Sequence, residues 1–273
     1  MLLSLAVIKE KWIIASSMTG RLAILNPDTG DTVTSIRPHE KYATRVLYEE
    51  PYVVSSAYDK TLCVHSIVFH ESGLPSFAED GVGKIQLPTP PEALAVVSLP
   101  AKSEKALVFS RRDSTFLFYH LLQDGLPFHS ERNLAPGASS WVSYHPMSIA
   151  VNPVNPKILA VGTSSTPHMK LMLVEVDTEN VLKEVFTGAP QSAYSTAVVQ
   201  WRPDASGVWL NGDEGIVRGV GVKCGKVRCS LKACEGGEKV RTLWAGVVEG
   251  AGEVLVTGGF DKGLNIWVVE SEE

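Results

Sequence analysis

The chain contains little cysteine, little net charge and no long apolar run. Its 273 residues include only 4 cysteines, too few for the disulfide framework of a small secreted domain. The apolar opening Met1 to Ile8 ends at Lys9, so it is too short for a membrane span, and no basic region precedes it as in a signal peptide. The net charge of -5 does not indicate a polyanion-binding surface. We therefore expect a protein inside the cell, cytoplasmic or nuclear, whose partners include neither membrane nor nucleic acid.

Sequence motifs for catalysis and cofactor binding are also missing. The chain has no H-E-x-x-H, G-x-S-x-G or phosphate-loop motif. The nearest approach to a dinucleotide fingerprint is Gly219-Val-Gly221-Val-Lys-Cys224, where Cys224 takes the place of the third glycine and no βαβ unit surrounds it. This segment is more typical of a strand with permissive glycines. The sequence predicts no catalytic residues and no cofactor.

Three of the four cysteines, Cys224, Cys229 and Cys234, lie close together and raise the alternative of a metal site. Zinc sites use four ligands with short cysteine spacings, and no histidine nearby in sequence completes a set here. On a strand, Cys229 shares one face with Val227 and Leu231, which favours a small buried apolar residue. We expect structural cysteines and no metal.

What the chain does have is many short segments of alternating apolar residues, and no helix-length stretch with a period of 3.6. The clearest example is the final stretch, which predicts two strands joined by a tight turn at Gly258-Gly259 and Asp261-Lys-Gly263. Its apolar residues follow the two-residue period of a strand at Val254, Val256, Leu264, Ile266 and Val268.

This hairpin has an internal copy. Tyr52 to Ser66 parallels Val254 to Val269, with Tyr58-Asp59-Lys60 matching Phe260-Asp261-Lys262. A second internal similarity relates Asp124-Gly-Leu-Pro-Phe128 to Ser72-Gly-Leu-Pro-Ser76. Repetition of this kind indicates duplication of one structural unit.

Six units of short strands can be followed along the chain. They begin near Leu2, Pro38, Glu92, Ser148, Thr196 and Val240. Six units of four strands would need twenty-four, and the sequence predicts about one fewer because the last unit ends after its third strand.

The repeated hairpin resembles the centre of a WD40 blade, in which the turn carries Asp and the following strand carries Trp. Asp261 and Trp267 match these places, although Val268 follows Trp267 where the family has Asp. Pro38-His39 resembles the Gly-His that opens a WD40 repeat, and Trp201-Arg-Pro-Asp204 resembles a common strand end of the family. The resemblance covers the whole chain.

The resemblance implies an all-β fold, a β-propeller of six blades of four antiparallel strands, as one domain over residues 1–273. In this family a His and an Asp share a buried polar contact that fixes adjacent loops. The structural positions that the resemblance implies here are His39, Asp59, Asp113, Asp213, Asp261 and Trp267.

The last blade is expected to be three-stranded, with Leu264 to Val269 as an open edge. One hypothesis is that a strand from a partner completes it. The alternatives are that the acidic residues 270–273 protect a short edge, or that the sequence lacks a native segment.

The resemblance further implies protein binding on the face made by the second turn of each blade and by the links between blades. The candidate contacts are Glu40, Tyr42, Arg45, Arg111, Arg112, Trp141, Tyr194, Glu214, Arg241 and Phe260. Arginine and aromatic residues are enriched at binding hot spots. The alternative is structural, since Trp141 and Tyr194 could pack between blades and the arginines could be solvated.

We therefore predict a non-catalytic scaffold for protein interactions in an intracellular multiprotein complex. Two alternatives stay open. One is a reader of acidic or modified peptide tails, which would use arginines at the central opening. The other is a propeller hydrolase with acidic and histidine residues at a central channel.

Overall fold

The computed structural model describes residues 1–99, 104–135, 145–165, 168–176, 178, 180–192 and 196–269. The chain divides into two compact units, each described by itself below. The first unit comprises Met1–Val96, Lys105–Asp113 and Phe118–Ser130, and the second comprises Val97–Glu104, Ser114–Leu117 and Glu131–Glu273. The single domain over residues 1–273 remains a prediction.

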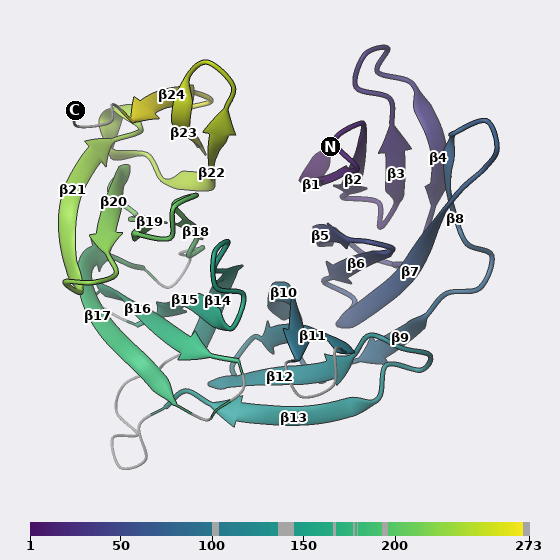
Figure 1. Ribbon diagram of the computed structural model, residues 1–273, viewed down its shortest axis with the longest axis horizontal. Coiled ribbons are helices and arrows are strands. Elements are labelled where there is room, and N and C mark those ends of the chain that lie inside the picture. Colours follow the sequence, from purple (N-terminus) through teal and green to yellow (C-terminus); the bar gives the residue numbers. More distant parts are fainter. Residues whose placement is uncertain are drawn as a thin grey trace. The chain divides into compact units, whose positions relative to one another are not determined.

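The strands of the described ranges form six antiparallel sheets in chain order, with four, five, four, four, four and three strands (Figure 1). These sheets are called blades 1 to 6 here. They confirm the all-β, six-bladed fold expected from the sequence. The helix found in the described ranges is a single 3-10 turn, η1 (Glu235–Gly237). None of the helical structure there has the length and apolar character of a membrane span.

The first unit contains blades 1 and 2. Blade 1 consists of β1 (Leu2–Ile8), β2 (Trp12–Ser17), β3 (Leu22–Leu25) and β4 (Thr32–Ile36). Blade 2 consists of β5 (Ala43–Glu49), β6 (Tyr52–Ala57), β7 (Thr61–Phe69), β8 (Pro75–Phe77) and β9 (Gly83–Gln86). The long β7 pairs with β9 along its first half and with β8 along its last residues, so two short strands share the outer position.

Blade 3 draws its residues from both units. It consists of β10 (Pro91–Leu99), β11 (Glu104–Arg111), β12 (Phe116–Leu121) and β13 (Phe128–Asn133), paired in that order.

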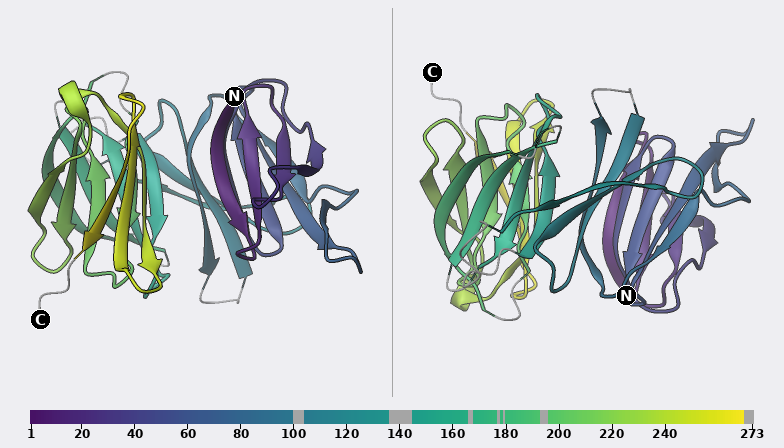
Figure 2. Two further views of the ribbon diagram at one scale, coloured as in Figure 1. Left: turned by 90° about the horizontal axis from the view of Figure 1, so that it is seen from above. Right: turned by 90° about the horizontal axis from the view of Figure 1, so that it is seen from below.

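The second unit contains blades 4 to 6. Blade 4 consists of β14 (His145–Val151), β15 (Ile158–Ser164), β16 (His168–Glu175) and β17 (Val181–Pro190). Blade 5 consists of β18 (Val199–Trp201), β19 (Gly207–Asn211), β20 (Ile216–Gly221) and β21 (Lys226–Lys232). Blade 6 consists of β22 (Val240–Val248), β23 (Gly252–Gly259) and β24 (Leu264–Val269), which lie side by side in Figure 2. The expected three-stranded last blade is confirmed.

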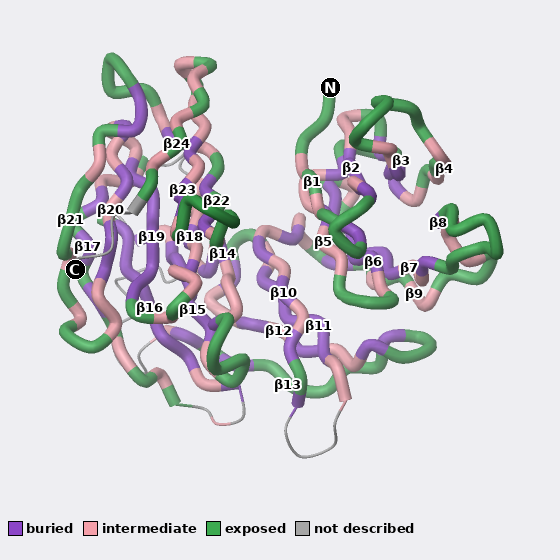
Figure 3. Tube along the Cα trace, turned by 45° about the horizontal axis from the view of Figure 1, so that its top comes forward, coloured by how far each residue is buried: buried purple, intermediate pink, exposed green. Residues whose placement is uncertain are grey.

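The cores lie within each unit between successive blades. Every residue of β19 is buried (Figure 3), and Val208 and Leu210 pack with Trp201 and Leu171 of the second unit. Burying aliphatic side chains on both faces of the middle strands stabilises the fold by about 25 cal/mol for each Å² of apolar surface removed from water. The loops at the strand ends are left to carry the polar chemistry.

The prediction that Cys229 is a buried apolar residue is wrong. Cys229 is exposed, because β21 is the outermost strand of blade 5 and a register shift interrupts its pairing with β20. Cys63 and Cys234 are the buried cysteines, and Cys224 is exposed.

Candidate functional site

The second turn of a blade lies against the link that enters the same blade. In blade 2 the backbone N–H of Tyr58 donates to the carbonyl oxygen of Tyr42 at 3.0 Å. In blade 6 the N–H of Phe260 donates in the same way to the carbonyl of Lys239 at 3.1 Å. The side chains of the turn and of the link are therefore brought together, which makes this loop surface the candidate site.

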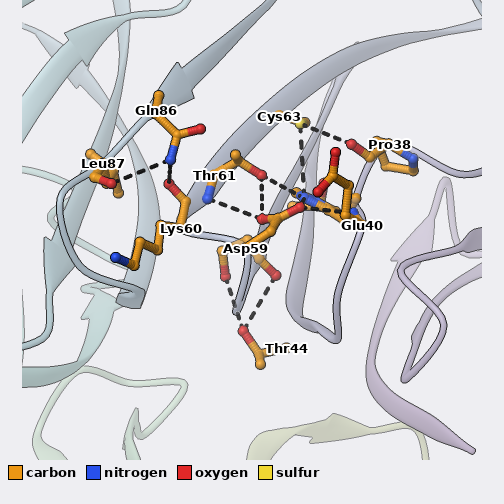
Figure 4. A network of polar contacts seen from close by, with 12 residues as sticks. Pro38, Glu40, Thr44, Asp59, Lys60, Thr61, Cys63, Gln86 and Leu87 are labelled. Atoms are coloured by element: carbon orange, nitrogen blue, oxygen red, sulfur yellow. Dashed lines mark hydrogen bonds and ion pairs between the residues drawn. The ribbon is translucent and has the colours of Figure 1, made fainter.

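The turn of blade 2 is fixed by a buried polar network (Figure 4). His39 lies between Ser55 and Thr61, with 2.8 Å from its Nε2 to Ser55 Oγ and 2.8 Å from its Nδ1 to Thr61 Oγ1. Asp59 accepts hydrogen bonds from the hydroxyl and the backbone N–H of Thr61, and from the N–H of Glu40 at 2.9 Å. Asp59 Oδ2 lies 3.4 Å from His39 Nδ1. Each member of the network thus satisfies a neighbour that burial removes from water.

Burial controls the protonation of this network. It lowers the pKa of His39, against the opposing effect of the Asp59 carboxylate, so the neutral ring is favoured. Burial alone would raise the pKa of Asp59, but the hydrogen bonds from Thr61 and Glu40 outweigh it and lower that pKa. The network therefore holds a neutral imidazole beside an ionised carboxylate.

Blade 6 repeats this arrangement with a cysteine. The N–H of Glu235 donates to Asp261 Oδ2 at 3.2 Å, as the N–H of Glu40 does to Asp59, so Cys234 lies at the place of His39. Burial, and then Asp261, raises the pKa of Cys234 to about 11. The thiol is buried and protonated, which is a structural role.

The other predicted structural position of blade 6 is Trp267. Its Nε1 donates to Thr257 Oγ1 at 3.4 Å, and Thr257 is fully buried. Thr257 stands four residues before Asp261, as Ser55 stands four residues before Asp59. The two blades therefore use the same hydroxyl position with different partners.

The turn of blade 5 keeps the bond from the link N–H to the turn Asp, with Gln191 at the place of His39, and the turn of blade 3 does not match it in the same way. Asp213 accepts from the N–H of Ser192 at 2.9 Å and pairs with Lys239 at 2.8 Å, and Glu214 forms an ion pair with Arg218. Asp113 is exposed and has a φ of 61°, the left-handed conformation that Lys60 (φ 67°) has in blade 2.

Three loops of the first unit bring two tyrosines and an arginine together, and we call Tyr42, Tyr58, Glu92 and Arg112 the tyrosine–arginine surface. The rings of Tyr42 and Tyr58 meet edge to face at 6.1 Å. The guanidinium of Arg112 lies 5.5 Å from the Tyr58 ring centre and donates to Glu92 at 2.6 Å. Tyr42 is 47% and Tyr58 43% exposed, which is a large aromatic area in contact with solvent.

The contacts of Arg112 fix its orientation. Its hydrogen bond to the Tyr58 hydroxyl, and then its pairing with Glu92, raise the pKa of Arg112, while burial opposes them. Thr89 donates from its hydroxyl to the carbonyl oxygen of Arg112 at 2.6 Å. A side chain ordered in this way loses less rotamer entropy when it binds a partner.

The remaining predicted residues of the first unit are Glu40, Arg45 and Arg111. Glu40 is exposed, and Arg45 on β5 is partly buried near Glu92, where burial lowers its pKa. Arg111 lies over the ring of Phe118 at 5.3 Å. Arg111 therefore has a packing role in blade 3, whereas Glu40 is open to solvent.

In the second unit the structure brings Arg241 and Phe260 together, and we call these two residues with Thr196 the arginine–phenylalanine surface. The guanidinium of Arg241 lies 4.2 Å from the ring centre of Phe260 and donates to Thr196 Oγ1 at 2.6 Å. Phe260 is 56% exposed. Trp141 and Tyr194 lie outside the described residues.

Sequence reasoning missed Tyr58 and Glu92 as members of the surface. Tyr58 stands directly before the turn Asp, at the place that Phe260 occupies in the other copy of the hairpin, and this signal was available. Glu92 carried no signal, because only the fold brings β10 beside Arg112. Among the described residues, no group of His, Cys, Asp and Glu is placed to hold a metal ion.

Comparison with known proteins agrees with this architecture. A family model described as "UCP007778, beta-propeller domain" matches residues 3–268. The solved WD40 beta propeller domain of Doa1 is similar in fold, with a TM-score of 0.72 at 15% identity over 99% of this chain and 79% of that chain. The computationally designed Ika8 protein is also similar, with a TM-score of 0.62 at 15% identity over 98% of this chain and 71% of that chain.

The search of curated proteins gave no match. The two structural likenesses concern the fold, whereas the family match extends over nearly the whole sequence. The chain therefore belongs to the family described as "UCP007778, beta-propeller domain", with a WD40-like propeller fold.

Proposed function

We propose that this protein is a non-catalytic scaffold that binds other proteins through its link and turn loops, as part of an intracellular multiprotein complex in the cytoplasm or nucleus. The observation that carries the proposal is the tyrosine–arginine surface, where two exposed aromatic rings meet and one of them contacts an oriented arginine. Tyrosine and arginine are the residue types that dominate binding hot spots. WD40-like propellers bind proteins in general, which supports the same conclusion.

The experiment is capture of partners by the purified chain, compared with the double variant Tyr58→Ala and Arg112→Ala. Hot-spot residues cost about 2 kcal/mol or more when truncated, so capture of at least one partner should fall by about thirtyfold. The matched control is Phe128→Ala, an exposed aromatic (57%) on β13. Equal capture by all three proteins would remove the surface from the proposal.

A second candidate is a reader of acidic or modified peptide tails, favoured by the arginine–phenylalanine surface. In the described part of the chain no carboxylate lies within ion-pair distance of Arg241, whereas Arg112 is paired with Glu92. A guanidinium stacked on an aromatic ring and free of a carboxylate is suited to an anionic ligand. Titration with a glutamate-rich peptide should show binding that Arg241→Ala abolishes. Equal binding by Arg241→Ala would contradict this candidate.

The partners of the scaffold include one that donates a strand to blade 6. The open edge of β24 supports this part of the proposal, because unpaired backbone groups on an edge strand accept a strand from another chain. The chemistry of that strand is developed next.

A further inference from the structure

Blade 6 has one strand fewer than its neighbours. In the described ranges β24 pairs with β23 on one side and ends the sheet on the other. The third strands of blades 1, 3, 4 and 5, which are β3, β12, β16 and β20, are paired on both sides. The third strand of blade 2, β7, pairs with both β8 and β9.

The residues of β24 do not protect an exposed edge. Its sequence, Leu-Asn-Ile-Trp-Val-Val, contains no charged residue and no proline, the residue types that protect exposed edges. The outermost strands β13, β17 and β21 each carry charged residues, with Glu131, Lys183 and Lys226 as examples, whereas the short outermost strand β4 carries none. The sequence of β24 therefore favours a covered strand.

One face of blade 6 is apolar, and its positions on β22 and β24 are open to solvent, whereas Val254 on the middle strand is buried. The register aligns Trp244, Val256 and Ile266 across the three strands, and it aligns Val254 with Val268 in the next row. Trp244 is 48%, Ile266 66% and Val268 57% exposed. The strand that completes the blade would lie beside Ile266 and Val268 and continue these rows.

The opposite face of β24 is packed against the core of the second unit. Trp267 aligns with Leu255, which is fully buried. In blade 4 the outer-strand Val185 lies opposite the buried Leu171, and in blade 5 Leu231 lies opposite the buried Val217. An aliphatic residue of an incoming strand opposite Trp267 would continue blade 6 as these residues continue blades 4 and 5.

We infer that blade 6 accepts an extended segment of another protein, antiparallel to β24, with aliphatic side chains beside Ile266 and Val268 and a further aliphatic residue opposite Trp267. The inference rests on the proposed scaffold function and specifies the chemistry of one partner. The direction follows from the sheets, since the recorded strand pairs of this chain are antiparallel. Backbone pairing supplies affinity and the alternating side chains supply specificity.

The test uses the full chain extended after Glu273 by a flexible glycine and serine linker and a strand of eight alternating valine and threonine residues. The linker raises the effective concentration of the strand to the millimolar range. Hydrogen exchange of the β24 amides should slow at least tenfold relative to the unextended chain, and exchange of β20 should stay unchanged. A control extension with proline at every second position cannot form the ladder and should leave β24 unchanged.

Two variants separate strand pairing from a general effect of the extension. Ile266→Lys places a charge in the exposed row and should remove most of the slowing, and Leu182→Lys on the paired strand β17 should retain it. Leu182 is 48% exposed, so the control tolerates the charge.

Three outcomes would overturn the inference. The first is hydrogen exchange of β24 in the unextended monomer that is already as slow as that of β20. This would show that a segment of the same chain pairs with β24. The second is protection of β24 that increases with protein concentration, together with dimers in sedimentation. This would show that β24 pairs with a second copy of this chain. The third is no slowing by the tethered strand. None of these depends on Tyr58 or Arg112, so the capture experiment tests the scaffold function independently.

Discussion

Blades 2 and 6 are built on the same hairpin but differ in what surrounds its turn. In blade 2 the turn Asp59 meets a buried His39, and the sheet is completed by β8 and β9. In blade 6 the turn Asp261 meets Cys234, and the sheet ends at β24. The comparison teaches that the hairpin forms from local sequence, whereas the polar network and the outer strand are supplied by other segments and vary independently.

The stability of the protein should respond most differently in the two blades when the turn Asp of each blade is replaced by Ala. Asp59→Ala leaves the hydroxyl of Thr61 and the N–H groups of Thr61 and Glu40 without their acceptor, in a site where the Asp59 side chain is 7% exposed. The free energy of unfolding should fall by about 3 kcal/mol. Asp261→Ala should cost clearly less. Denaturant unfolding measures both, and equal losses would show that the two turns are equivalent.

A smaller difference is expected at the hydroxyl position of each blade. Ser55→Ala leaves the Nε2 of buried His39 without its partner at 2.8 Å and should cost about 2 kcal/mol. Trp267→Phe removes a longer hydrogen bond of 3.4 Å to Thr257 and should cost under about 1 kcal/mol. Thermal unfolding measures the loss of stability in both variants. A larger loss in Trp267→Phe than in Ser55→Ala would contradict the expected difference between the two blades.

Acidification should destabilise blade 2 through His39. Burial lowers the pKa of His39, so the unfolded chain binds this proton at a higher pH than the folded chain does. The stabilisation is therefore present above the ordinary value of about 6.5 and is lost as the pH falls through the folded pKa. His39→Gln should flatten this dependence without abolishing it, because burial lowers the pKa of His65 as well. A pH series of unfolding midpoints that is unchanged in His39→Gln would contradict the assignment.

The smallest predicted difference concerns the reactivity of the cysteines and not stability. It tests the structural role of Cys234. Burial raises the pKa of Cys63 and of Cys234 to about 11, so both thiols should resist iodoacetamide until the chain unfolds. The exposed Cys224 and Cys229 should be alkylated in the native protein. Peptide mass spectrometry reads all four sites, and rapid native labelling of Cys234 would contradict a structural role.

The sequence predicts the blades better than their loops. Alternating residues such as Val254, Val256 and Ile266 define strands directly, so the six units and the short last blade could be predicted. The sequence did not predict that two short strands, β8 and β9, share the outer edge of blade 2, because this arrangement depends on the length of β7. Local alternation also misassigned Cys229, since a register shift is set by the neighbouring strand.

The candidate site could be predicted only in part. The resemblance to WD40 blades pointed to Tyr42, Arg112 and Phe260, because it places the second turns and the links between blades on one binding face. Their actual neighbours, such as Glu92 beside Arg112, come from other strands and have no local signal. Contacts between loops of different blades depend on how the sheets pack, which alternation within one strand does not encode.

The measurement that tests the central claim most directly is photo-crosslinking from a single position of the chain in cells. A benzophenone amino acid is placed at Tyr42 on the tyrosine–arginine surface, or at Phe186, which is 75% exposed on the outer strand β17. We predict a discrete adduct with another protein from position 42 that Arg112→Ala weakens, and none from position 186. Adducts from position 186 alone, or equal adducts from both, would contradict binding through the loop surface.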